Sequence, residues 1–103
     1  MTDYYCGSCK TLIAKQNFVL EIHTNEFSDL IPIFVLLRDS YNLIEGDLKI
    51  EKKIQIMINC SYKNLKCKKC FKNMGKIYFS FTNPDIMLSR LIIIKNSNLK
   101  FYK

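Results

Sequence analysis

The sequence predicts a mainly antiparallel β protein, and three observations lead to that class. Apolar and polar residues alternate with a period of two in several segments, which is typical of half-buried strands. Glycine and proline number only three and two in 103 residues, and no long stretch has the spacing of an amphipathic helix. The length allows one domain with a modest core, so we expect a single domain over residues 1–103.

The clearest strand pattern covers residues 48–59. A helix would scatter its isoleucines around the axis, whereas an extended chain collects them on one side. We therefore expect one long, half-buried strand, which a turn at residues 45–47 would precede. Its apolar face, interrupted only by Lys52, consists of Leu48, Ile50, Ile54, Ile56 and Ile58.

Other segments predict shorter strands. Residues 17–22 alternate, and residues 31–37 form a continuous apolar run typical of a central strand. In residues 76–82 we expect Ile77, Phe79 and Phe81 to point inward and the residues between them outward. Residues 91–95 and 99–102 flank an Asn-Ser-Asn sequence that indicates a hairpin. We expect a turn at residues 83–85 and a single helical turn within residues 85–90.

The charge is unevenly distributed along the chain. Residues 1–51 contain 4 basic and 8 acidic residues, whereas residues 52–103 contain 12 basic and 1 acidic, giving the net +7. Such asymmetry indicates a face for nucleic acid or an acidic protein. It also fits a compositional bias, because Ile, Lys and Asn make up 37 of the 103 residues.

Four of the five cysteines form two C-x-x-C pairs, Cys6/Cys9 and Cys67/Cys70, with 57 residues between them. Each pair can bend around one ion, and two pairs supply the tetrahedral shell of a structural zinc. We therefore expect one Zn²⁺ bound by Cys6, Cys9, Cys67 and Cys70. The ion would join the start of the chain to a hairpin in its last third, so folding should depend on the metal.

Other uses of the cysteines fit less well. A redox C-x-x-C pair needs a βαβ context, disulfides need an oxidising compartment, and iron–sulfur ligands are usually clustered. Four sulfurs would also leave no open position for catalysis at zinc. We expect Cys60 to be a small core residue.

The residues indicate binding more strongly than catalysis. His23 is the only histidine, has no matching nucleophile motif, and is expected to lie in a solvated loop. Lysines with interleaved aromatic residues surround the second pair and are compatible with nucleic-acid binding or with a solvated hairpin. These residues are Lys63, Lys66, Lys68, Lys69, Lys72 and Lys76, with Tyr62, Phe71 and Tyr78.

The spacing of the cysteine pairs, and short motifs around them, resemble the Yippee-like or β-tent zinc domains, and most closely the Mis-eighteen centromere proteins. After the second pair that family has a Gly and then a Tyr, followed by a Thr-containing turn, an Arg, an apolar strand and a closing Tyr. The segments of this chain that resemble the pattern are Tyr5-Cys6-Gly7-Ser8-Cys9, Gly75-Lys76-Ile77-Tyr78, Thr82-Asn83-Pro84-Asp85, Arg90 and Leu99-Lys100-Phe101-Tyr102.

The resemblance implies a β-tent fold and a non-enzymatic scaffold. Relatives pair with another copy or a paralogue and help to recruit the machinery that loads the centromeric histone. The alternative, also by resemblance, is an RNA- or DNA-binding domain like the C-terminal RNA-sensing domain of innate-immunity helicases.

The start of the chain lacks a basic segment and an apolar signal region, and its longest apolar run is eight residues. We therefore expect no membrane association. We also expect no small-molecule substrate, and a nuclear location at centromere or chromatin, or otherwise a cytoplasmic one.

Overall fold

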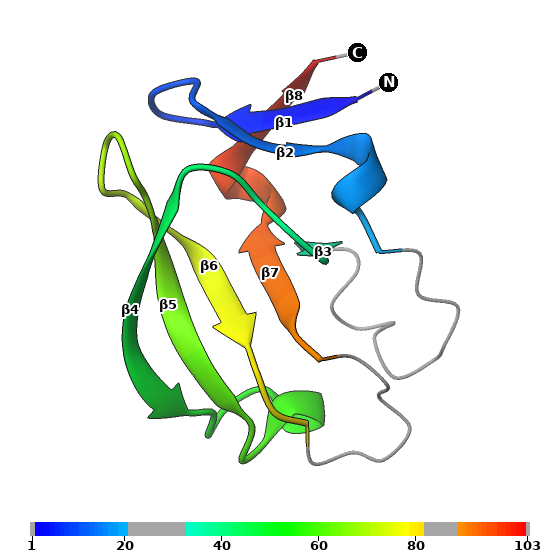
Figure 1. The fold of residues 1–103 in the computed structure, drawn as a ribbon, viewed down its shortest axis with the longest axis vertical. Helices are drawn as coiled ribbons and strands as arrows, with labels where there is room; N and C mark the ends of the chain where they lie inside the picture. Colours follow the sequence, from blue (N-terminus) through cyan, green and yellow to red (C-terminus); the bar gives the residue numbers. More distant parts are fainter. Residues whose placement is uncertain (1, 21–32, 82–88, 103) are drawn as a thin grey trace.

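The computed structural model of the chain describes residues 2–20, 33–81 and 89–102, and these form two antiparallel sheets (Figure 1). The smaller sheet has the order β2-β1-β8, with β1 at Asp3–Cys6, β2 at Leu12–Lys15 and β8 at Leu99–Tyr102. The larger has the order β3-β7-β6-β5-β4, and its strands are β3 (Phe34–Leu37), β4 (Leu43–Ile50), β5 (Ser61–Cys67), β6 (Asn73–Tyr78) and β7 (Leu91–Lys95).

The described residues also contain short 3₁₀ turns between the strands, which are η1 (Gln16–Phe18), η3 (Gln55–Met57) and η4 (Asn96–Asn98). The predicted mainly β class is confirmed. Within the described residues, no helix has the length and hydropathy that a membrane crossing requires.

The first and last strands pair with each other, because β1 runs antiparallel to β8 from Asp3↔Tyr102 to Cys6↔Leu99. In Figure 1 the small sheet lies across one end of the larger one. This arrangement places the first cysteine pair, which begins with the last residue of β1, beside the end of the large sheet.

The large sheet has a buried cluster on each face. The first cluster joins the small sheet to the large one through residues such as Ile13, Leu37 and Ile92, and it includes Cys6 and Cys67. The second lies on the opposite face, as the alternation of Ile92 and Ile93 between clusters shows. Its buried residues are Leu36, Met57, Cys60, Tyr78, Leu91 and Ile93.

Gly75 is required where β6 passes β7. A Cβ added at Gly75 would lie 2.0 Å from the carbonyl oxygen of Ile93, and real side chains do not approach backbone so closely. The pairing of Gly75 with Ile94 therefore depends on the absence of a side chain.

The predicted strand at 48–59 is wrong beyond Ile50, where β4 ends. Glu51 ends it by accepting the backbone N–H groups of Lys52 and Lys53 on Oε2, both at 3.1 Å. The backbones of Glu51 and of residues 59–60 then bond to each other, which closes residues 51–60 into a loop containing η3. Leu48 and Ile50 are 62% and 44% exposed, because β4 is an edge strand and nothing described covers them.

The expected turn at residues 45–47 is instead a bulge within β4, where the register with β5 shifts between Glu45 and Leu48. The expected strand at 17–22 is also wrong at its start, because Gln16–Phe18 forms η1, and of the following residues Val19 makes only an isolated bridge to Leu37. Of the apolar run at 31–37, the strand covers Phe34–Leu37.

The inward–outward assignment in residues 76–82 is right for Ile77 but wrong for Tyr78 and Phe79. Ile77 and Tyr78 are both buried, because they pack into the two clusters on opposite faces of the sheet, while Phe79 is 37% exposed. The expected hairpin at 91–102 is wrong too. Both strands exist, but η4 redirects the chain so that β7 joins the large sheet and β8 the small one.

Several expectations lie outside the described residues. These are His23, residues 21–22 and 31–32 of the expected strands, the turn at 83–85, and residues 85–88 of the expected helical turn.

Candidate metal centre

The two cysteine pairs occupy equivalent positions at the ends of two strands. Cys6 is the last residue of β1 and Cys67 the last residue of β5, and each strand is followed by a tight turn that holds the second cysteine. A strand end fixes the first sulfur of each pair, and the turn brings the second sulfur back toward it.

The backbone of the two turns is built in the same way. In the first, Lys10 N–H donates to the Cys6 carbonyl at 2.9 Å and Cys6 N–H donates to the Thr11 carbonyl at 2.8 Å. In the second, Phe71 N–H donates to the Cys67 carbonyl and Cys67 N–H to the Lys72 carbonyl, both at 2.9 Å. Lys10 and Phe71 share a left-handed backbone with φ of 61°, so the two pairs are conformational copies.

The four sulfurs come together at one point. The Cys6 and Cys70 Sγ atoms are 3.7 Å apart, those of Cys9 and Cys67 are 3.5 Å apart, and all four lie within 4.8 Å of one another. A tetrahedral zinc with Zn–S bonds of about 2.3 Å requires sulfurs separated by about 3.8 Å. The thiols are free rather than bridged. The donor set and its spacing therefore fit one zinc ion.

Burial decreases across the cluster. Cys6 and Cys67 belong to the core between the sheets, Cys9 is partly buried and Cys70 is exposed. An ion held here would bridge β1 of the small sheet and β5 of the large one. Bound zinc would supply a cross-link with four thiolates and no open coordination position.

The surroundings of Cys9 and Cys70 shift the pKa values of these two thiols in opposite directions. The Thr11 hydroxyl lies 3.1 Å from Cys9 Sγ and, together with the Thr11 backbone, lowers the pKa of the Cys9 thiol to about 6. For Cys70, the backbone of Lys72 lowers the pKa, but burial and the neighbouring sulfurs raise it to about 11. Thr11 thus supports the thiolate form of Cys9, which is the form that binds a metal.

The remaining predicted site residues lie elsewhere. Cys60 is fully buried in the second cluster, away from the four sulfurs, as expected of a core residue. Around the second cysteine pair, Lys66, Lys68 and Lys69 are exposed and Phe71 is 64% exposed. Lys76 and Tyr78 belong to a separate polar group.

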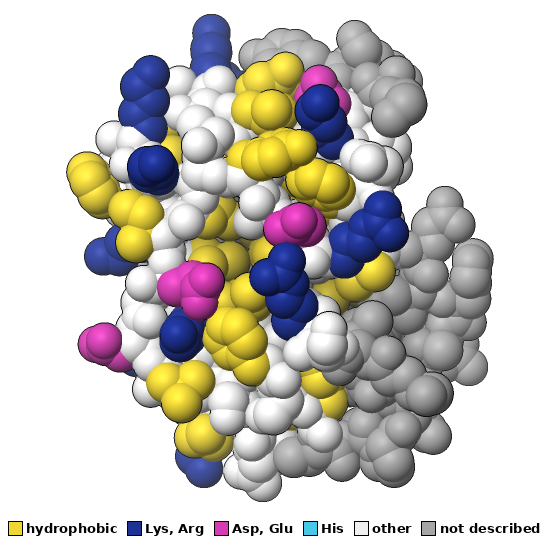
Figure 2. All heavy atoms as spheres, viewed as in Figure 1, with side chains coloured by type: hydrophobic (Ala, Val, Ile, Leu, Met, Phe, Trp, Pro, Cys, Tyr) yellow, Lys and Arg dark blue, Asp and Glu magenta, His cyan; other side chains and the backbone are white. Residues whose placement is uncertain are grey.

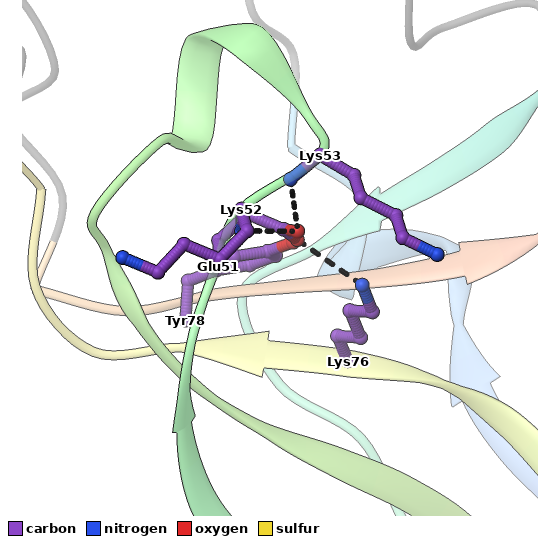
Figure 3. Close-up of polar contacts among 5 residues, drawn as sticks. All are labelled: Glu51, Lys52, Lys53, Lys76 and Tyr78. Carbon is purple, nitrogen blue, oxygen red and sulfur yellow. Dashed lines mark hydrogen bonds and ion pairs between the residues drawn. The ribbon is translucent and has the colours of Figure 1, made fainter.

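That group centres on Glu51, which is only 2% exposed (Figure 3). Its Oε1 accepts the Tyr78 hydroxyl and, at 3.1 Å, Lys76 Nζ. Lys76 Nζ also lies 4.5 Å from the centre of the Tyr62 ring. Burial would raise the pKa of Glu51, but the hydrogen bonds from Tyr78, the backbone N–H of Lys53 and Lys76 outweigh it and lower the pKa to about 2.

Local sequence does not mark Glu51 as a special residue, because Glu51 is one of several polar positions in a period-two pattern. Its partners are 25 and 27 residues away, so only the tertiary fold brings them together. Thr11 was also missed, although a hydroxyl two residues after a C-x-x-C pair is a signal that could have indicated it.

Comparison with known families decides what kind of domain this is. A family model described as "Yippee zinc-binding/DNA-binding /Mis18, centromere assembly" matches residues 3–103. The chain belongs to this Yippee-Mis18 family. This member of a zinc-binding family thus has four clustered cysteines, which agrees with the predicted single zinc site.

A solved structure agrees with the family assignment. The chain is similar to a solved structure described as "Crystal Structure of Mis18 'Yippee-like' Domain", with a TM-score of 0.73 and 19% sequence identity. The match covers 99% of this chain and 95% of that one, so the Yippee-like fold extends over nearly all of the Yippee-Mis18 chain. Among curated proteins, none matches the sequence.

Proposed function

We propose that the protein is a non-enzymatic, zinc-stabilised interaction module that acts in centromere and chromatin assembly in the nucleus. The observation that carries the proposal is a four-sulfur cluster joining two sheets, in a chain whose family is described by zinc binding and centromere assembly. On this proposal Cys6, Cys9, Cys67 and Cys70 are the zinc ligands, and residues 1–103 act as a single domain.

The geometry supports a structural role for the metal. Four thiolates complete a tetrahedral shell, so no position remains for a water or a substrate at the ion. The two strands that carry Cys6 and Cys67 belong to different sheets, so the ion stabilises their relative placement.

Strand β4 supports a role in pairing with a second copy or a paralogue. It forms one edge of the large sheet, and Ile44, Leu48 and Ile50 are each more than 40% exposed. Figure 2 shows apolar side chains mixed with acidic and basic ones over β4 and β5, at the left of the view. An exposed edge with apolar side chains is a template for pairing with another chain.

The assembly part of the proposal is tested by the mass of the protein in solution. Light scattering should give more than one copy of the wild-type chain per particle, or a complex when a paralogue is added. Leu48→Lys should reduce this to a monomer, whereas Ile33→Lys, which changes an equally apolar and 51% exposed residue beside the opposite edge strand, should not. A wild-type monomer that binds no paralogue would contradict the assembly role.

The cellular part is tested by location. A fluorescent fusion should concentrate at centromeres, and Cys67→Ser, which removes a proposed ligand, should disperse it. A fusion that never enters the nucleus would contradict this part.

A second candidate function is binding of RNA or DNA at the second cysteine pair. It is favoured by Phe71, whose exposed ring lies between Lys69 and Lys72 and could stack on a base. Binding to duplex DNA or RNA that falls steeply with salt and is weakened by Phe71→Ala would favour this candidate.

A further inference from the structure

A cavity lies on the large sheet, on the face turned away from the small sheet. Its volume is about 570 Å³, within the range of known ligand sites. Its wall includes Ile93, which belongs to the second buried cluster, whereas the neighbours Ile92 and Ile94 belong to the cluster between the sheets. Neither the four cysteines nor any residue of β4 lines the cavity.

The floor of the cavity is apolar and comes from three different segments. Phe34 of β3, Ile93 of β7 and Ile54 of the loop after β4 all line it. Phe34 and Ile54 are only partly buried, so they offer apolar surface to a ligand. One aliphatic side chain could be held there.

Two lysines line the cavity, and they differ in how their charge is satisfied. Lys76 is already paired with Glu51 and stacked on Tyr62. Lys95 is exposed and makes no ion pair with any residue in the described part of the chain. The described part of the lining thus presents one unpaired positive charge beside an apolar floor.

Uncharged hydrogen-bonding groups complete the lining. Asn64, Asn73 and Ser97 line the cavity, and none of their side chains bonds to a residue that the structure describes. Such groups can pair with the backbone of an extended peptide. Asn98 differs, because its Nδ2 already donates a hydrogen bond to the Met74 carbonyl at 2.9 Å.

The surroundings of the cavity are positive as well. The strand register puts Lys49 opposite Tyr62 and Lys66 opposite Ile44, so both lysines share the face of Lys76. Glu45 lies opposite the buried Leu65, on the other face. This face therefore attracts an acidic partner over a longer range.

These observations favour a peptide over a nucleic acid. A nucleic-acid groove needs several free cations and open aromatic rings. Among the described residues that line the cavity, Lys95 is the one unpaired cation, while Lys49 and Lys66 lie outside the lining; Lys76 covers the Tyr62 ring, and Tyr78 is fully buried.

We propose that this cavity binds an acidic peptide segment of another protein, with an apolar side chain on the floor of Phe34, Ile54 and Ile93 and a neighbouring carboxylate on Lys95. The inference is independent of the oligomerisation proposed above, because β4 does not line the cavity.

The test uses the zinc-loaded chain and a short dye-labelled peptide, Ser-Glu-Glu-Leu-Glu-Ser. Fluorescence polarisation should show binding that falls at least about tenfold with Lys95→Glu, the change expected when an ion pair becomes a repulsion. Lys100→Glu, which alters an exposed lysine on β8 of the other sheet, should change affinity by less than about twofold. Peptides with Ser for Leu or Gln for Glu should both bind more weakly.

Backbone amide shifts in NMR place the peptide. The signals of Asn64, Asn73 and Lys95 should move, and those of Cys9 and Cys70 should not. The proposal is overturned if the peptide does not bind, if Lys95→Glu and Lys100→Glu weaken it equally, or if the shifts occur outside the cavity. It is also overturned if duplex RNA displaces the peptide from these residues and binds them more tightly.

Discussion

Replacing Glu51 by Gln should destabilise the domain by about 2–3 kcal/mol. The donors around the Glu51 carboxylate outweigh its burial and lower its pKa from an ordinary 4.5 to about 2, which corresponds to about 3 kcal/mol of stability at neutral pH, since each factor of ten in proton affinity is worth about 1.4 kcal/mol. The amide of Gln keeps the shape and can still accept the Tyr78 hydroxyl. Its NH₂ group, however, would face the two backbone N–H donors of Lys52 and Lys53, and Lys76 would lose its counter-ion.

The pH dependence separates this account from a simple loss of packing. The folded-state pKa lies below the unfolded one, so the charged carboxylate stabilises the domain fully above about pH 4.5, and the stabilisation is lost as the pH falls from 4.5 through 2. The difference between wild type and Glu51→Gln should therefore be equal at pH 8 and pH 6 and should shrink only below about 4.5.

The assay is urea denaturation of the zinc-loaded proteins, with unfolding monitored by circular dichroism. Glu45→Gln is the matched control, because Glu45 is 48% exposed and pairs with Lys63 at 3.6 Å, so its change should stay within about 0.5 kcal/mol. Equal stability of wild type and Glu51→Gln at pH 7, or equal effects at both glutamates, would refute the reasoning.

Three further predictions test other parts of the structure. Gly75→Ala should destabilise by about 3 kcal/mol or more in urea denaturation, since its Cβ would collide with backbone, while Gly46→Ala, with a nearest contact of 3.5 Å, should cost less than about 1 kcal/mol; equal effects would contradict the close approach of the strands. Cys67→Ala should abolish zinc binding and cooperative folding, whereas Cys60→Ala should retain the metal and lose about 1 kcal/mol; loss of zinc with the second variant would contradict the ligand set. Thr11→Val should lower zinc affinity about tenfold in a competition with a chelating dye, since it removes the hydroxyl beside Cys9, and unchanged affinity would show that the hydroxyl has no role.

The sequence predicted the chemistry of the site better than its surroundings. Two C-x-x-C pairs are compatible with very few kinds of site. Cys6, Cys9, Cys67 and Cys70 could therefore be grouped before their distances were known. The distinction of Cys60 from the other four could be made for the same reason, since it has no partner at the right spacing.

The fold class was predictable, but the strand details were not. Period-two alternation indicates an extended chain, yet it cannot show that Ile77 and Tyr78 face two separate cores or that Leu48 lies on an exposed edge. The break at Glu51 depends on hydrogen bonds to Tyr78 and Lys76, which lie on a strand distant in sequence. Local pattern contains no information about such partners.

The expected hairpin of β7 and β8 was wrong for the same reason. The Asn96–Asn98 segment resembles a hairpin turn locally, but pairing of β8 with β1 draws the chain into the other sheet. The first strand of the chain, more than 90 residues earlier, thus determines what this short turn does.

The most direct test of the account is the metal content of the purified protein. Native mass spectrometry, with elemental analysis of the same sample, should find one zinc per chain, and chelation should remove the metal and the cooperative unfolding transition together. A chain that folds cooperatively without zinc, or that keeps its zinc after Cys67→Ala, would contradict the central claim that one ion on four cysteines joins the two sheets.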